Sequence, residues 1–215
     1  MLEGRILVWG AGGHARVVAE IIRCVGRSEI VGFLDNVNPE RHTTEFCGAT
    51  VLGGAEQLTR LAKEGVSDIV IALGDCSTRL RSAFMAIEAG FHLATVCHPS
   101  AVVAQSATIG SGSVLVAGVI INPECVIGSN VIVNTGATVD HECIVEDGVH
   151  IGPGVHIGGN SRIGRGAWVG IGATVIDRVT IGAGTIIGAG AVVVHDIPEN
   201  VVAYGVPAGV KRKLS

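Results

Sequence analysis

His141 is the residue whose type and neighbours best suit proton transfer. It stands between two acids, Asp140 and Glu142. A neutral imidazole accepts a proton near pH 7, and a carboxylate beside it can orient the ring and raise its basicity. Either acid suits that role, and on residue type alone the triplet could equally form a solvated polar turn. The segment therefore indicates a candidate general base at His141 and leaves its supporting carboxylate open.

A second group of residues is typical of nucleotide binding. The turn Gly10-Ala11-Gly12-Gly13-His14-Ala15 satisfies G-x-G-x-x-A, and Asp35 follows at the end of a strand-like run. Glycines let backbone N–H groups approach a phosphate at a helix start, and an acid at a strand end can hold a ribose or a base. A tight turn without a ligand is the alternative. Residues 5–97 are too few for a complete NAD-dependent dehydrogenase, which needs a second mononucleotide-binding half.

Three histidines, His141, His150 and His156, raise the question of a metal site. Their separations are not multiples of 18 residues, the length of one coil of the repeat described below, so they should not stack on one edge. Ligands shared between subunits would escape this test. The six cysteines lack CxxC spacing and indicate the reduced thiols of a cytoplasmic protein rather than a zinc site. We expect no metal.

The elements that must position these residues fall into two regions. Residues 1–97 alternate apolar runs with helical stretches, which predicts a small Rossmann-like domain with a mostly parallel sheet. We expect strands at 6–9, 30–34, 68–73 and 93–96, and helices at 15–24 and 78–89. Residues 98–215 form the second predicted domain, with a C-terminal tail.

The second region has a six-residue period, which predicts a parallel β-helix. Sixteen consecutive hexads carry an aliphatic residue at the same position, and four residues after each one the side chain is small or β-branched. The aliphatic positions are Val103, Ile109, Leu115, Ile121, Ile127, Val133, Val139, Val145, Ile151, Ile157, Ile163, Val169, Val175, Ile181, Ile187 and Val193.

Three hexads make one coil of a triangular prism, so residues 18 apart should stack at the spacing of neighbouring strands. Cys125 and Cys143 are such a pair at the inward small position. Because their Cβ vectors should run parallel, we expect stacked free thiols rather than a disulfide. Gly159 should stack beside His141 by the same rule. A glycine there would let a backbone N–H face a carbonyl oxygen, although it could also be an ordinary turn glycine.

The composition excludes several classes of protein. The chain has 215 residues, of which 48% are hydrophobic, 3% are aromatic and 32 are glycine, and its net charge is −4. This hydrophobic content argues against a disordered chain, and the negative charge argues against a generic nucleic-acid binder. No apolar run reaches the ~18 residues that a membrane span needs.

Six segments carry a resemblance to a known family: Gly10–His14, Phe33–Asn36, Ala72–Asp75, His98–Ala101, Asn134–Cys143 and Gly205–Ala208. The chain resembles the bacterial nucleotide-sugar N-acetyltransferases of the PglD type, whose relatives include the perosamine N-acetyltransferases and the sialic acid O-acetyltransferase NeuD. The resemblance implies a left-handed β-helix, an exception to the usual crossover hand, and a homotrimer with active sites between adjacent prisms.

The resemblance also implies roles for individual residues. In the catalytic set, His141 would be the general base, Glu142 its supporting acid with Asp140 in reserve, and the Gly159 N–H an oxyanion donor. The nucleotide-sugar would meet Gly12, Gly13, His14, Asp35, Asn36 and Gly74. Acetyl-CoA would meet His150, Gly159, Ile171 and Gly188.

The activity that follows is acetyl transfer from acetyl-CoA, as co-substrate, to the 4-amino group of a UDP- or GDP-linked 4-amino-4,6-dideoxy sugar in glycan biosynthesis. No permanently bound cofactor, nucleic acid or membrane span is expected. O-acetylation of sialic acid or another sugar, as in NeuD, is the nearest alternative. A metal-dependent hydratase and a non-catalytic nucleotide-sugar sensor are alternatives from other classes.

Overall fold

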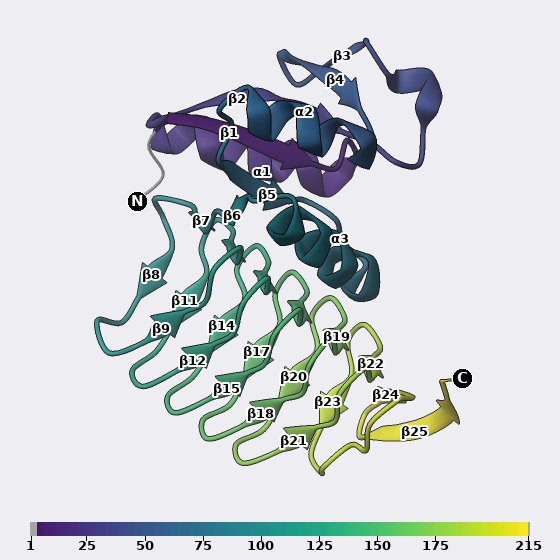
Figure 1. Cartoon of the computed structure of the whole chain (residues 1–215). Coiled ribbons are helices and arrows are strands. Elements are labelled where there is room, and N and C mark those ends of the chain that lie inside the picture. The colour runs from purple at the N-terminus through teal and green to yellow at the C-terminus, as the bar shows by residue number, and fades with distance from the viewer. Residues whose placement is uncertain (1–3, 215) are drawn as a thin grey trace. The chain divides into compact units, whose positions relative to one another are not determined.

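The computed structural model describes residues 4–214, which divide into two compact units between Pro99 and Ser100 (Figure 1). The first unit is a sheet with helices, and the second is a stack of short parallel strands. Each unit is described by itself.

The sheet of the first unit has the strand order β3-β4-β2-β1-β5-β6. All neighbouring pairs are parallel except β3 and β4, so the mostly parallel sheet predicted from the alternating pattern is confirmed. The strands are β1 (Gly4–Trp9), β2 (Ser28–Leu34), β3 (Glu45–Phe46), β4 (Ala49–Gly53), β5 (Asp68–Ile71) and β6 (His92–Leu93).

Three α-helices and two 3₁₀ turns accompany this sheet. Helix α1 (Gly13–Val25) buries an apolar stripe at helical spacing and ends at Gly26, whose left-handed φ of 69° suits glycine. Helix α3 (Cys76–Glu88) is capped by Asp75, whose side chain accepts a hydrogen bond from the Thr78 N–H at 2.8 Å. The others are α2 (Leu58–Lys63), η1 (Pro39–Arg41) and η2 (Ala55–Gln57).

Two local predictions for this unit differ from the structure. The strand expected at 93–96 is wrong, because the chain leaves the sheet after β6 and forms a separate strand, β7 (Val96–Cys97). The strand expected at 68–73 ends at Ile71, so Ala72 to Gly74 form the following loop. The β3–β4 hairpin and α2 have no counterpart among the predicted elements.

The second unit contains sixteen two-residue strands, β8 to β23, and each one ends on the aliphatic residue of a hexad. They form three faces, named here by their first strands. The β8 face holds β8 (Val102–Val103), β11 (Ile120–Ile121), β14 (Thr138–Val139), β17 (His156–Ile157), β20 (Thr174–Val175) and β23 (Val192–Val193). The β9 face holds β9 (Thr108–Ile109), β12 (Val126–Ile127), β15 (Ile144–Val145), β18 (Arg162–Ile163) and β21 (Thr180–Ile181). The β10 face holds β10 (Val114–Leu115), β13 (Ile132–Val133), β16 (His150–Ile151), β19 (Trp168–Val169) and β22 (Ile186–Ile187), and is extended by β24 (Val201–Gly205) and β25 (Ala208–Lys213).

The predicted 18-residue register is confirmed throughout this stack. Ile121 pairs with Val139, and Val139 pairs with Ile157. From Leu115 to Val193 the aliphatic position is at most 2% exposed in every hexad, so these side chains form a continuous narrow core. Such burial contributes about 25 cal/mol per Å² of apolar surface, which explains a stable core without aromatic residues.

The three corners of the prism differ in sequence. From Gly112 to Gly190 each turn places one residue in the left-handed region, and where the β10 face leads to the β8 face that residue is glycine from Gly118 to Gly190. Where the β8 face leads to the β9 face, the left-handed residues carry side chains: Glu124, Glu142, Asn160 and Arg178. A left-handed backbone is costly for such residues, so this corner, called the 142 corner below, is specialised.

Candidate active site

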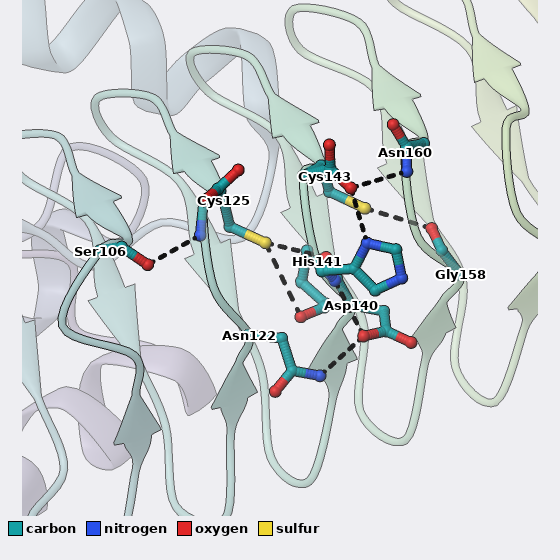
Figure 2. Close-up of polar contacts among 11 residues, drawn as sticks. Ser106, Asn122, Cys125, Asp140, His141, Cys143, Gly158 and Asn160 are labelled. Carbon is teal, nitrogen blue, oxygen red and sulfur yellow. Dashed lines mark hydrogen bonds and ion pairs between the residues drawn. The ribbon is translucent and has the colours of Figure 1, made fainter.

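His141 lies at the 142 corner, in the turn between β14 and β15. Its Nδ1 is 3.0 Å from Oε2 of Glu142, and both side chains are about half exposed. Figure 2 shows the His141 ring in this turn. An Nδ1–H donated to this carboxylate leaves Nε2 as the proton acceptor. The geometry thus pairs the ring with Glu142 and presents Nε2 as its reactive nitrogen.

Asn160 contacts this pair through Glu142, whereas Asp140 contacts the backbone of the turn. Asn160, one coil above Glu142, donates from Nδ2 to the same Oε2 atom at 3.1 Å. Asp140 points elsewhere, since its Oδ1 accepts from the Asn122 amide and from the His141 N–H, both at 2.8 Å (Figure 2). Asp140 therefore fixes the backbone of the turn rather than the imidazole.

The electrostatics of the site favour an ionised carboxylate beside a more basic imidazole. The hydrogen bond that Nδ1 donates to Glu142 raises the pKa of His141 above its ordinary value, and the charges of Asp140 and Glu142 raise it further. The same bond, followed by that from Asn160, lowers the pKa of Glu142. Glu142 therefore stays ionised, and His141 is a stronger base than a free imidazole.

Gly159 lies directly against the imidazole. A Cβ built on Gly159 would be 2.7 Å from both Cε1 and Nε2 of His141, which is closer than real Cβ atoms approach. Only a residue without a side chain leaves room for the ring. The Gly159 carbonyl accepts from the Arg178 N–H, whereas its own N–H donates to no residue of 4–214.

The inward cysteines lie beneath this turn. Cys125 and Cys143 are unexposed and free, as predicted. Sγ of Cys125 donates to the Asp140 carbonyl at 2.8 Å, and Sγ of Cys143 donates to the Gly158 carbonyl at 3.1 Å (Figure 2). The thiols thus satisfy carbonyl groups that point into the prism.

A groove of about 470 Å³ runs over the β8 face next to the 142 corner. Its lining includes Asp140, Gly158 and Asp177 as well as His156. Nδ1 of His156 lies 2.9 Å from Oγ1 of Thr138. The groove offers room for a ligand beside Asp140 and Gly158, which precede the candidate base and Gly159 in the sequence.

The residues expected to meet acetyl-CoA lie along a different part of the prism. His150 is on the β10 face, where its ring stacks on Trp168 with centroids 5.2 Å apart and an angle of 5° between the rings. Ile171 is exposed in the turn that follows β19, and Gly188 follows β22, near the Tyr204 side chain. Within one chain these three residues do not join His141 and Gly159.

The residues expected to meet the nucleotide-sugar follow three neighbouring strands of the first unit. Gly12, Gly13 and His14 follow β1, Asp35 and Asn36 follow β2, and Gly74 follows β5. These strands are adjacent and parallel in the order β2-β1-β5, so the three loops meet at one sheet edge, where α/β folds bind ligands.

A cavity of about 300 Å³ lies at this edge, lined by Trp9, Asp35, Asn36 and residues of α3. The Trp9 indole donates to Oδ1 of Asn36 at 2.8 Å, which leaves the Asn36 amide NH₂ as the group offered to a ligand. The Asp35 carboxylate instead accepts hydrogen bonds from Val37 and Asn38 of its own loop. Although burial raises its pKa, hydrogen bonds from Asn38 and Val37 hold the pKa below its ordinary value.

The other expectations concern metals and membranes. Within residues 4–214, no three His, Cys, Asp or Glu side chains gather as a metal site would require. His150 is buried on the β10 face and His156 is exposed on the β8 face. No helix of the described chain has the length and apolarity to cross a membrane.

Sequence reasoning missed three supporting residues: Asn160, Asn122 and the thiol of Cys143 as a donor. The signal was available, because Asn160 lies 18 residues after Glu142 and Asn122 lies 18 before Asp140. The stacking rule that found Gly159 would have found both.

Comparison with family models gives two matches. Residues 5–85 match the PglD N-terminal domain, and residues 160–195 match the bacterial transferase hexapeptide (six repeats). A curated relative, UDP-N-acetylbacillosamine N-acetyltransferase of Bacillus subtilis, is 35% identical over 114 residues. This alignment covers 52% of the chain and about half (51%) of the relative's length.

Solved structures match nearly the whole chain. A histidine-to-alanine variant of GDP-perosamine N-acetyltransferase from Caulobacter crescentus, in complex with CoA and GDP-perosamine, is 41% identical with a TM-score of 0.92, and 96% of each chain is covered. The acetyltransferase domain of PglB from Neisseria gonorrhoeae in complex with acetyl coenzyme A is 40% identical with a TM-score of 0.90, over 96% of this chain and 98% of that one. The predicted fold, a Rossmann-like unit followed by a left-handed β-helix, is confirmed.

Proposed function

The chain belongs to the PglD-type family of left-handed β-helix acetyltransferases, and we propose that it transfers an acetyl group from acetyl-CoA to the 4-amino group of a nucleotide-linked 4-amino-4,6-dideoxy sugar. The observation that carries this proposal is the arrangement at the 142 corner. His141 is paired through Nδ1 with Glu142, and its ring lies against Gly159.

His141 acts as the general base in direct transfer. The amine nitrogen attacks the thioester carbonyl carbon and forms a tetrahedral intermediate, and Nε2 of His141 takes the proton that the nitrogen loses. Collapse of the intermediate breaks the carbon–sulfur bond, and the imidazolium returns the proton to the departing CoA thiolate. No acyl-enzyme forms, because the nearby Cys143 is fully buried and faces the core.

Glu142 and Gly159 stabilise the charges of this reaction. Glu142 holds the ring through Nδ1 and favours the imidazolium that forms. The N–H of Gly159 donates to the oxyanion of the intermediate, a kind of contact whose loss typically costs about 10²–10³ in kcat. The absence of another partner for this N–H within residues 4–214 supports that role.

The first unit binds the nucleotide, with Gly12, Gly13, His14, Asp35, Asn36 and Gly74 at its sheet edge. The N–H groups at the start of α1 suit the diphosphate, since the first turn holds no acidic residue. The Asn36 NH₂ group suits a carbonyl acceptor on the base. Uracil and guanine both present one, so the base is left to experiment.

The active form is a homotrimer with its sites between prisms. His150, Ile171 and Gly188 hold acetyl-CoA in this proposal, yet in one chain they lie away from His141. A neighbouring copy would supply the missing half of the site to each prism. The six cysteines of the chain are all free thiols, as expected of a protein that works in the reducing cytoplasm.

The test is thiol release from acetyl-CoA with parallel panels of UDP- and GDP-linked 4-amino-4,6-dideoxy sugars and free sialic acid. Release with an amino sugar, together with a mass gain of one acetyl group on it, supports N-acetylation and identifies the base. Release with sialic acid alone would refute N-acetylation in favour of O-acetylation. Failure to release thiol with every acceptor would refute the transferase itself.

A further inference from the structure

We propose that Cys143 is a positioning residue for acetyl transfer: its buried thiol fixes the peptide between Gly158 and Gly159 so that the Gly159 N–H faces the thioester oxygen. This inference rests on the proposed function. On the inner side of the 142 corner, the Cys143 thiol is directed at the Gly158 carbonyl, as Figure 2 shows.

The direction of the peptide follows from its two ends. The Gly158 carbonyl accepts a hydrogen bond from Cys143, a residue with 0% exposure, so this carbonyl points into the prism. The peptide between Gly158 and Gly159 is trans, since within residues 4–214 the only cis peptide bond is Val206–Pro207. In a planar trans peptide the N–H points opposite to the C=O. The Gly159 N–H therefore points outward, on the side where the half-exposed His141 ring lies.

The neighbouring coil shows how this peptide differs. Cys125 makes the same contact one coil earlier, to the Asp140 carbonyl. The N–H of that peptide belongs to His141 and donates to Oδ1 of Asp140, so it is already used. The Gly159 N–H donates to nothing within the described chain, so it is available to a ligand.

The thiol is a reliable donor in this place. The Cys125 sulfur beside it and burial both raise the pKa of Cys143, so the sulfur keeps its proton at neutral pH. A hydrogen bond to a carbonyl also polarises the peptide and strengthens its N–H as a donor. Cys143 therefore sets both the direction and the strength of the proposed oxyanion contact.

Ser161 provides a matched control one coil later. Its Oγ donates to the Ile176 carbonyl at 3.1 Å from the same column of the prism. A hydroxyl thus fits this column, which makes Cys143→Ser the conservative replacement. Ser161→Ala removes this bond and the one that its Oγ accepts from the Val179 N–H at 3.3 Å, both one coil beyond Cys143, so it reports the general cost of losing the hydrogen bonds of this column.

The experiment compares Cys143→Ala, Cys143→Ser and Ser161→Ala by kcat, KM for both substrates, pH profile and melting temperature. We expect Cys143→Ala to lower kcat by about tenfold, less than loss of an oxyanion donor itself, with KM and the pH profile unchanged. Cys143→Ser should restore kcat, and Ser161→Ala should lower the melting temperature without lowering kcat. Unchanged kcat in Cys143→Ala, or an equal loss in Ser161→Ala, would overturn the proposal.

A second readout does not depend on turnover. In protein labelled with ¹⁵N-glycine, the Gly159 amide resonance can be identified by its disappearance in Gly159→Ala. It should shift in Cys143→Ala and return toward its original position in Cys143→Ser. An unmoved resonance would overturn the inference, whereas inactivity of the wild-type protein toward every acceptor would overturn only the proposed function.

Discussion

The contact between Gly159 and His141 allows a quantitative prediction for Gly159→Ala. The new Cβ would be 2.7 Å from Cε1 and Nε2 of His141, and ordinary contact begins at 3.4 Å. The ring is half exposed and can swing outward, so it should yield by about 0.7 Å or more rather than destabilise the fold. A displacement of about 1 Å at a reacting group can cost about 10²-fold in rate.

We therefore expect kcat of Gly159→Ala to fall by about 10²-fold, or about 2.7 kcal/mol of transition-state stabilisation. The assay is thiol release at saturating acetyl-CoA and acceptor, with the melting temperature measured in parallel. Gly209→Ala is the matched control, since a Cβ at Gly209 meets no atom within 4 Å and its φ is not left-handed. Turnover of Gly159→Ala within about threefold of wild type would refute the reasoning.

A double-mutant cycle of Gly159→Ala and His141→Asn shows whether the loss of kcat in Gly159→Ala acts through the imidazole. If alanine at this position displaces His141, it should cost little more once His141 has become asparagine. Fully additive losses would instead mean that Gly159 and His141 act independently.

Three further predictions concern the support of the base and of the two units. Glu142→Gln should lower kcat by about tenfold or more and move the acidic limb of the kcat/KM profile to lower pH, because the Glu142 carboxylate raises the pKa of His141; an unmoved limb would contradict this. Asp75→Ala should cost about 1 kcal/mol in urea unfolding of the first unit. Since the bond to Thr78 lowers the pKa of Asp75, that difference should be present above about pH 4 and vanish as the pH falls through the folded-state pKa; a constant difference would argue against the cap. Ile151→Ala should cost about 2–5 kcal/mol in the prism core, because Ile151 is 0% exposed, and a loss below 1 kcal/mol (about one hydrogen bond) would contradict continuous packing.

The prism could be predicted almost completely from sequence. Its pattern is strictly periodic, so each aliphatic residue from Val103 to Val193 identifies a strand, and 18-residue spacing gives the register. No competing element interrupts the hexads. Handedness could not be derived from the period, because a six-residue repeat fits either hand.

The first unit was harder because its elements are irregular. The β3–β4 hairpin turns at Cys47 and Gly48, both with left-handed φ, and cysteine is not a usual residue for that conformation. The run from Leu93 to Val96 is apolar enough for one strand, but the chain leaves the sheet at Ala94. Tertiary context, not local pattern, decides such short segments.

Sequence spacing located the centre of the candidate site but not its supports. It placed Gly159 beside His141, where the structure has it. It could not choose between Asp140 and Glu142, because side-chain direction depends on the left-handed backbone at Glu142 and on the competing amide of Asn122. These are properties of the folded turn.

The most direct test of the account is the turnover of His141→Asn, with the binding of CoA and of the nucleotide-sugar measured separately by calorimetry. If His141 is the base, turnover should fall by about 10²–10⁴-fold while both ligands still bind. Turnover close to that of wild type, with both ligands bound, would contradict the central claim.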